Sequence, residues 1–413
     1  MGKKLGKKVL VLGGGLLQIP LILKAREEGY QVYLSDYYPD PPGKNYSHNF
    51  RQISTFSVED NYRYAQEENI DYIMTVGTDQ PVYTAAAVSE RLGLPFPISE
   101  EQGKSVTNKV YMKTKMAEYG IPTPNYKVFA QFAEFSPDGL RYPLVMKPVD
   151  SQGQRGIFIL DGREDQAELK EKFALARQFS LTKTVIVEEF YSGDEITVNC
   201  WVKDGQAFNL LITDRLHFDD SIALGVCKQQ RYPSKAARGR QKEIDGIVQN
   251  LVNAFGIKDG PLYIQMVVGT EGSKIIEFGY RIGGGFESET VPQVTGVDIL
   301  DLYFTLVTEG KNLFEPGQVR EKARLGSIFF MFAQPGVVEK ISVPQDFAGY
   351  HGRIFVKKGE QIAAVENATS RVGCFEFYTD SPDEYYRFLK EFDAKLAFYD
   401  KNNRDLLIHG IWE

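Results

Sequence analysis

The stretch PLVMKPVDSQGQRGIFIL (143–160) joins two β-rich runs through a polar, glycine-spaced loop. The first run carries Lys147, and the loop holds Ser151, Gly153 and Gly156. Exposed N–H groups without bulky apolar side chains let such a loop fold over phosphates, and a lysine beside it supplies a point charge. The lysine precedes the glycines and no helix follows, so this is not a Walker A loop. The alternative is a mobile hairpin beside a solvated lysine.

A second motif, VIVEEFYSGDEITVN (185–199), is an apolar strand that ends in two carboxylates, turns, and restarts with Glu195. This short connection leaves Glu188 and Glu195 on either side of a backbone segment. The N–H and C=O groups of that segment can form hydrogen bonds with the edge of an adenine. A carboxylate just beyond it is suited to accept hydrogen bonds from ribose hydroxyls. The alternative is a plain hairpin with exposed acids.

A third motif, PLYIQMVVGTEGSKIIEFGYRIGGG (261–285), contains two β runs around a turn, and counting outward places Gln265 opposite Glu277. Strand alternation predicts two faces, with Glu277, Gly279 and Arg281 on one and Ile276, Phe278 and Tyr280 on the other. A carboxylate suits Mg²⁺ and an arginine suits a developing anionic oxygen. The three glycines after Arg281 let a substrate approach the backbone. A structural ion pair between Glu277 and Arg281 is the alternative.

The rest of the chain predicts α/β and α+β architecture. Strands and helices alternate over 8–94, which indicates a doubly wound parallel sheet. Residues 108–120 read as one helix that ends at a glycine, before a proline pair. Strands dominate 126–280, which indicates antiparallel sheets. A helix is predicted near 298–309, short strands resume after about 325, and another helix is predicted at 382–399.

Composition points to small-molecule chemistry. The 413 residues carry a formal net charge of -7, which gives no reason to expect nucleic acid or an anionic membrane as partner. Three widely spaced cysteines and four isolated histidines indicate neither a disulfide framework nor a metal cluster. The basic N-terminus has too short an apolar run for a signal peptide, so we expect a cytoplasmic protein.

The segment LGGGLLQ, with Asp36 at the end of the next strand, suggests a nicotinamide-binding turn as an alternative. With Gly13 and Gly15 as the first two glycines, the third glycine position holds Gln18, whose long side chain would hinder close helix–strand packing. The other interpretation is a flexible βα turn beside a small substrate.

Taken in order, Lys109, the Lys147 strand with its loop, the EEF hinge with Glu195, and the strand from Glu277 to Arg281 resemble the ATP-grasp superfamily. The resemblance covers most of the chain. LGGGLLQ and SDYYPDPPG are similar to the carboxylate–amine ligases of purine synthesis and to carbamoyl-phosphate-synthase-like proteins. GPLYIQM and RVGCFEFYTDSPDE look closer to L-amino-acid ligases.

The resemblance implies three domains: an N-terminal doubly wound parallel-sheet domain (1–105), an ATP-grasp body of two α+β lobes (106–315, inner lobe about 125–190) and a small C-terminal α+β domain (316–413). It implies a set of nucleotide-contacting residues, which comprises Lys109, Lys147, Ser151, Gly153, Gly156, Glu188, Glu189, Phe190, Tyr191 and Glu195. Among these, the loop from Ser151 to Gly156 closes on ATP, Glu188 to Tyr191 form the adenine hinge, and Glu195 binds ribose.

For catalysis, the resemblance implies that Arg281 and Lys147 steady the transferred group and that Glu277 and Gln265 hold Mg²⁺. The superfamily usually has an acid where Gln265 stands and an asparagine where Gly279 stands. A glutamine carbonyl can ligate Mg²⁺ but adds no charge, so affinity should be weaker unless the substrate, or a nearby acid such as Glu287 or Glu289, compensates.

The expected function is therefore an ATP- and Mg²⁺-dependent ligase that joins a small carboxylate to an amine through an acyl phosphate. No nucleic acid or membrane partner is expected, and a homodimer is left open. The alternative is a degenerate or regulatory ATP-grasp protein that binds ATP without turnover. A nicotinamide-dependent oxidoreductase is third.

Overall fold

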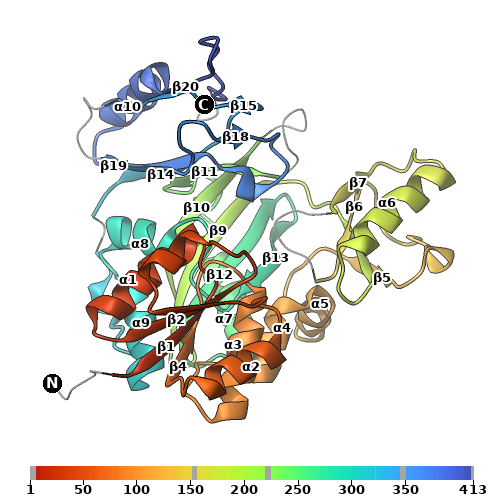
Figure 1. Ribbon diagram of the computed structural model, residues 1–413. Helices are drawn as coiled ribbons and strands as arrows, with labels where there is room; N and C mark the ends of the chain where they lie inside the picture. Colours follow the sequence, from red (N-terminus) through yellow and green to blue (C-terminus); the bar gives the residue numbers. More distant parts are fainter. Residues whose placement is uncertain (1–5, 151–155, 219–224, 321, 345–349, 411–413) are drawn as a thin grey trace.

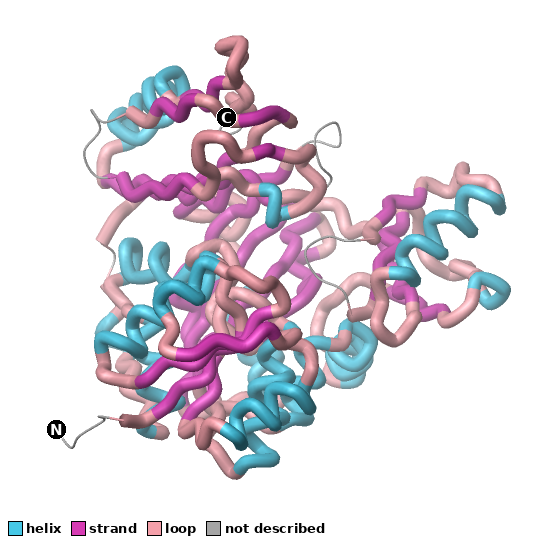
Figure 2. Tube along the Cα trace, in the orientation of Figure 1, coloured by secondary structure: helices cyan, strands magenta, loops and turns pink. Residues whose placement is uncertain are grey.

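The computed structural model describes residues 6–150, 156–218, 225–320, 322–344 and 350–410. Figures 1 and 2 show a long, twisted antiparallel sheet, with a parallel N-terminal sheet and its helices packed beside it and a small lobe projecting to one side. No described helix is long and apolar enough to cross a membrane.

The N-terminal sheet is parallel and has helices on both faces. Its strand order is β3–β2–β1–β4, and its elements are β1 (Lys8–Leu12), α1 (Ile19–Glu27), β2 (Gln31–Asp36), β3 (Asn49–Gln52), α2 (Val58–Glu67), β4 (Tyr72–Met74) and α3 (Gln80–Leu92). Val9 and Val11 pack with α1, whereas Leu10 and Leu12 pack with α2 and α3. Burial on both faces explains the continuous apolar run of β1 and confirms the doubly wound sheet.

Two helices, α4 (Glu100–Thr107) and α5 (Lys109–Glu118), lead from this sheet into the body. The Asn108 side chain caps α5 by accepting from the amides of Val110 and Tyr111, and the sequence predicted this helix. The sequence analysis missed α4. Its Gly103 packs so tightly on α3 that an added Cβ would lie 3.2 Å from Tyr83 Cα, which explains a glycine inside the helix.

The small lobe is a four-stranded antiparallel sheet, ordered β5–β8–β6–β7, with α6 packed on one face. Its elements are β5 (Tyr126–Phe129), β6 (Leu144–Pro148), β7 (Phe158–Leu160), α6 (Gln166–Gln178) and β8 (Val185–Glu189). The lobe core joins Leu144, Met146, Val185 and Val187 to α6. The alternate residues of β6 and β8, including Lys147, therefore face away from α6.

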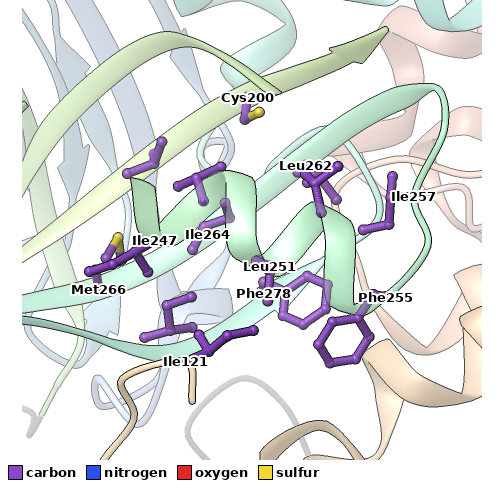
Figure 3. Close-up of a cluster of buried hydrophobic side chains, with 14 of the residues drawn as sticks. Ile121, Cys200, Ile247, Leu251, Phe255, Ile257, Leu262, Ile264, Met266 and Phe278 are labelled. Atoms are coloured by element: carbon purple, nitrogen blue, oxygen red, sulfur yellow. The ribbon is translucent and has the colours of Figure 1, made fainter. Parts of the chain in front are cut away.

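The long sheet has eight strands in the order β13–β12–β9–β10–β11–β14–β19–β17. They are β9 (Asp194–Lys203), β10 (Gln206–His217), β11 (Cys227–Tyr232), β12 (Gly260–Gly269), β13 (Gly272–Gly279), β14 (Leu325–Met331), β17 (Tyr350–Ile354) and β19 (Gly373–Thr379). Helix α7 (Gln241–Ala254) covers one face of β9, β12 and β13, where Leu251, Leu262 and Ile264 share a buried cluster (Figure 3). The opposite face of these strands is polar around Thr197, Asn199 and Gln265, whereas Trp201 on the same face packs in another apolar cluster.

The segment after residue 316 continues the long sheet, because β14 pairs with β11 and then with β19. Helix α10 (Pro382–Lys395) packs its Phe388 and Phe392 on that extension. The predicted helix at 382–399 is therefore too long: it ends at Lys395, and Ala397–Tyr399 form strand β20. The predicted domain limits stay predictions.

Two helices, α8 (Glu287–Thr295) and α9 (Ile299–Glu309), lie between β13 and β14. The sequence predicted α9 but missed α8, which contains Pro292 and β-branched residues that disfavour a helix. The remaining short elements are η1 (Leu16–Gln18), η2 (Pro42–Tyr46), η3 (Phe132–Glu134), η4 (Pro316–Gln318), β15 (Gly336–Val337), β16 (Lys340–Ser342), β18 (Gln361–Ile362) and η5 (Ala368–Ser370).

Candidate active site

The segment EEFYSGDE is a hinge between two sheets and not a hairpin. Strand β8 ends at Glu189 in the small lobe, whereas β9 begins at Asp194 in the long sheet. Both glutamates at the end of β8 are buried, with 2% of Glu188 and 7% of Glu189 exposed. The alternative of a plain hairpin with exposed acids is therefore wrong, and the hinge joins the two lobes of the body.

Glu188 lies between two buried lysines. Its carboxylate is 3.0 Å from Lys147 Nζ and 3.3 Å from Lys113 Nζ. Burial opposes ionisation of Glu188, but the two ammonium groups outweigh it and lower the pKa of this carboxyl. Lys147 is thus neither solvated nor unpaired, which removes the alternative of a hairpin beside a solvated lysine. A ligand that binds here meets a net positive charge.

Lys113 is a site residue that the sequence analysis missed. It is fully buried, and its ammonium group donates to Thr123 Oγ1 at 2.7 Å. Burial lowers its pKa to about 8, although Glu188 opposes this shift. The spacing of Lys109 and Lys113 on one helix was the available signal, because residues four apart share a helix face.

Lys109 opens α5 and brings that helix to the long sheet. Its ammonium nitrogen lies 3.8 Å from Glu277 Oε2 on β13. The predicted ATP lysines therefore face different acids, since Lys147 pairs with Glu188 and Lys109 pairs with Glu277. One pair thus lies within the small lobe, and the other joins α5 to the long sheet.

The predicted phosphate loop is only partly within the described residues. Ser151 and Gly153 lie outside them. Gly156 has φ +70°, and a Cβ there would lie 2.8 Å from the Phe179 ring and 3.2 Å from Pro148. Glycine is therefore required where the chain enters β7.

The outer side of the hinge holds the other predicted adenine-binding residues. Glu189 accepts from Arg141 and Asn125, and the Tyr191 hydroxyl donates to Gly272 O at 2.8 Å. Phe190 is 45% exposed. A cavity of about 250 Å³ lies against Glu189, Phe190 and Tyr191. Neither Lys147 nor Glu188 lines this cavity.

Glu195 is surrounded by polar groups of the long sheet. Its Oε1 accepts from Arg215 Nε at 3.0 Å and from the Gln265 amide, and Oε2 lies 2.9 Å from His217 Nε2. Burial opposes ionisation, but Arg215 and His217 lower the pKa of Glu195 overall. The sequence analysis missed Arg215 and His217, although their alternation along β10 put them on one face.

Gln265 and Glu277 are cross-strand partners, as predicted. One predicted face needs correction. A bulge between Gln265 and Met266 changes the register, so Ile275, in place of Ile276, joins Phe278 in the buried cluster. The two predicted metal-binding side chains thus stay on the polar face.

The residues present offer Mg²⁺ a sparse set of oxygen donors. The described residues contain no group of three or more His, Cys, Asp or Glu side chains placed to hold a metal ion. Glu287 and Glu289, which could have supplied the negative charge that Gln265 lacks, have other partners. Glu287 accepts from the Gly285 amide, and Glu289 pairs with Arg353 at 2.7 Å. One carboxylate, Glu277, and one amide, Gln265, fit a site completed by phosphate oxygens and water.

Arg281 does not pair with Glu277, so the alternative of a local ion pair is wrong. It forms a two-point ion pair with Asp79, with Nε–Oδ1 at 2.6 Å and Nη2–Oδ2 at 2.8 Å. Asp79 lies between β4 and α3, so this contact joins the N-terminal sheet to the body. Sequence reasoning missed Asp79.

The three glycines after Arg281 serve protein packing. A Cβ at Gly283 would lie 2.4 Å from Glu287, one at Gly284 would lie 2.5 Å from Gly77 O, and one at Gly285 would lie 2.3 Å from Gln230. The predicted use of these glycines by an approaching substrate therefore needs revision, because protein atoms already occupy the positions of the missing side chains.

The N-terminal glycine turn is held from within the protein. Asp36 accepts from the amides of Gly14 and Tyr38 at 2.7 and 2.8 Å. Gln18 is buried and donates to Val76 O at 2.6 Å. The Asp36 carboxylate thus stabilises the turn, which does not favour the nicotinamide alternative.

Comparison with known proteins agrees with this geometry. Residues 107–285 match the family model of the phosphoribosylglycinamide synthetase ATP-grasp (A) domain. A phosphoribosylamine–glycine ligase of Caldanaerobacter subterraneus subsp. tengcongensis is 23% identical over 419 residues, which cover 96% of this chain and 99% of that protein. The dapdiamide A synthase of Enterobacter agglomerans is 21% identical over 53% of each chain.

Solved structures share the fold. Phosphoribosylglycinamide synthetase from Anaerococcus prevotii has a TM-score of 0.76 at 17% identity, covering 96% of this chain and all of that one. L-amino acid ligase from Bacillus licheniformis has a TM-score of 0.77 at 22% identity, covering 97% and 100%. The chain therefore shares its fold with ATP-grasp enzymes, residues 107–285 match an ATP-grasp domain, and the curated relatives are carboxylate–amine ligases, which form carbon–nitrogen bonds. The comparisons give no support to the regulatory alternative.

Proposed function

We propose that the protein activates a small carboxylic acid with ATP and joins it to an amine, with Lys147, Lys109 and Arg281 acting on the phosphates and the acyl group. The observation that carries this assignment is the contact of Lys109 with Glu277, at 3.8 Å, which brings an expected phosphate-binding lysine onto the expected metal-binding strand. ATP would lie between β6, the hinge and the polar face of β12 and β13.

The proposed chemistry has two steps. A carboxylate oxygen of the acid attacks the γ-phosphorus, and ADP leaves with the electrons of the broken P–O bond. The amine then attacks the acyl carbon, inorganic phosphate leaves, and the amine loses one proton. Activation is needed because phosphate is a far better leaving group than oxide.

In the first step this chain contributes position and charge. Lys147 and Lys109 neutralise phosphate oxygens, while the loop amides from Ser151 to Gly156 orient the γ-phosphate. Hinge residues Glu188 to Tyr191 would receive adenine, and Glu195 would receive the ribose hydroxyls.

Glu195 must exchange hydrogen bonds to do so, because Arg215, His217 and Gln265 already occupy its carboxylate. Glu277 and the Gln265 carbonyl would hold Mg²⁺, which when bound neutralises negative charge on the phosphates. Arg281 would steady the reacting group, with Asp79 fixing the orientation of its guanidinium.

We further propose that one substrate is an amino acid. The curated relatives are named for joining phosphoribosylamine to glycine, and one structural neighbour is named an L-amino acid ligase. These names share an amino acid substrate. The domain limits at about 105 and 315, a cytoplasmic location and a homodimer are retained as further predictions.

The test is a matrix of acids and amines, including amino acids, assayed for ADP and phosphate release with Mg²⁺ and ATP. We expect ADP and phosphate release that requires both an acid and an amine in at least one combination. Tight ATP binding without ADP release from any combination would overturn the ligase and favour a nucleotide-binding regulator.

A further inference from the structure

Glu287, the first residue of α8, is a buried carboxylate that acts electrostatically on three arginines. Arg215, Arg281 and Arg371 each lie within electrostatic reach of Glu287, which is fully buried. Arg215 comes from β10, Arg281 follows β13, and Arg371 precedes β19. The chain thus collects three positive charges from distant segments beside the expected acyl site.

Two of these arginines have carboxylate partners and one does not. Arg281 pairs with Asp79, and Arg215 pairs with Glu195. Among the described residues no carboxylate forms an ion pair with Arg371. Its guanidinium lies 3.6 Å from the centre of the Phe330 ring, and Nη1 donates to Gly284 O at 3.4 Å. Its Nε is buried without a hydrogen-bond partner.

Arg371 is half-buried, and the buried part of its guanidinium is costly to leave without a partner. Burial lowers the pKa of Arg371, and Arg215 reinforces that shift. A guanidinium presents five N–H donors, of which the described protein uses few. A buried charge usually persists with a partner, because an isolated one loses its hydration without compensation.

The position of Arg371 connects it to the reaction site. Its carbonyl partner, Gly284, lies three residues after Arg281, and Gly77 donates to Ile282 O in the same loop. Stacking on Phe330 holds the guanidinium plane while leaving its edge for a planar anion. Arg371 thus lies at one end of the glycine loop and Arg281 at the other.

We propose that Arg371 binds a second anionic group, a carboxylate or a phosphate, on the ligase's acid or amine substrate. This inference rests on the proposed function. If Arg371 has this role, one substrate carries an anionic group in addition to the reacting carboxylate. Arg371 is then a specificity-determining residue in the C-terminal segment.

The matched control is Arg353 on neighbouring β17. It stacks on a phenylalanine as Arg371 does, 4.5 Å from the centre of the Phe286 ring, but it has a carboxylate partner in Glu289. Arg371→Met and Arg353→Met each remove a guanidinium that stacks on a phenylalanine. The two sites differ because the Arg353 guanidinium already pairs with a protein carboxylate and the Arg371 guanidinium does not. Arg371→Lys keeps the charge and loses the planar fork.

The binding experiment needs no turnover. Full-length protein saturated with β,γ-methylene-ATP, which fills the γ-phosphate position, is titrated with malonate or inorganic phosphate while its melting temperature is followed. One of these anions should raise the melting temperature of wild type and Arg353→Met. Arg371→Met should bind it about 10- to 150-fold more weakly, with Arg371→Lys between them. The anion with the larger Arg371-dependent effect identifies carboxylate or phosphate as the chemistry.

Equal binding to wild type and Arg371→Met would overturn the proposal, as would failure of both anions to stabilise the wild type. The ligase function is judged separately by ADP release, so the two claims can fail independently. Where turnover is found, Arg371→Met should raise KM for the substrate that carries the second anion by a similar factor and leave KM for ATP unchanged.

Discussion

Asp79 and Arg281 hold the N-terminal sheet against the catalytic body through two hydrogen bonds of 2.6 and 2.8 Å. The side chains are 15% and 7% exposed, so the pair is largely withdrawn from water. Arg281 is also the residue expected to steady the reacting group. The contact therefore links the packing of two parts of the chain to the orientation of one functional side chain.

Asp79→Asn should destabilise the protein and slow turnover while ATP affinity stays nearly unchanged. Removing one partner of a buried pair costs about 3 kcal/mol, because the other charge stays buried. Urea unfolding measures this loss, and phosphate release measures turnover. Glu67→Gln, which breaks a surface pair with Arg51, is the control and should cost less than about 1 kcal/mol. Equal losses for the two variants would contradict the structural role.

Lys147→Ala should weaken ATP binding about 10- to 150-fold, because it removes a charge-assisted phosphate contact. Calorimetry with ATP and Mg²⁺ measures the affinity. Lys127→Ala is the matched control, since Lys127 lies on β5 of the same small sheet, opposite Val187 of the core face. Unchanged affinity in Lys147→Ala would exclude the nucleotide from this position.

Lys113 should make stability depend on pH. Burial lowers its pKa from 10.5 to about 8, so between these values the unfolded chain binds more protons than the native protein. This group therefore makes the free energy of unfolding rise with pH through that window. The wild type should gain up to about 3 kcal/mol relative to Lys113→Met between pH 8 and 10.5.

Urea unfolding at a series of pH values measures this difference. Lys115→Met on the same helix is the control. A flat difference between wild type and Lys113→Met would mean that Lys113 titrates like a solvated lysine.

Mg²⁺ binding should depend on Glu277 far more than on Gln265, because only Glu277 carries charge. Glu277→Gln should reduce the rise in melting temperature that Mg²⁺ causes in the ATP-bound protein. Gln265→Glu should enlarge this rise, because it adds a second carboxylate beside Glu277. The same change removes the amide that donates to Glu195. Glu271→Gln, in the turn beyond these strands, is the control. An unchanged Mg²⁺ effect in Glu277→Gln would remove this residue from the metal site.

Local patterns predicted the strands of the site and their pairing. Gln265 lies opposite Glu277, as counted from the sequence, but the turn alone does not produce this pairing. The turn pairs Gly269 with Gly272, which would place Gln265 opposite Ile276, and a bulge moves its partner to Glu277. The bulge beside Gln265 could not be counted, since no glycine or proline marks it. Contacts between residues far apart in the sequence could not be predicted either. Asp79 pairs with Arg281, and Arg371 donates to Gly284, only because tertiary packing brings these residues together.

The central claim, an acyl phosphate formed from the substrate carboxylate, is tested most directly by isotope transfer. An acid that supports ADP release is labelled with ¹⁸O in its carboxylate and incubated with ATP, Mg²⁺ and the amine. The phosphate produced is then analysed by mass spectrometry. We expect one ¹⁸O atom in each phosphate released, because the carboxylate oxygen that attacks phosphorus leaves with it. Amide formation with unlabelled phosphate, or with AMP and pyrophosphate as products, would contradict it.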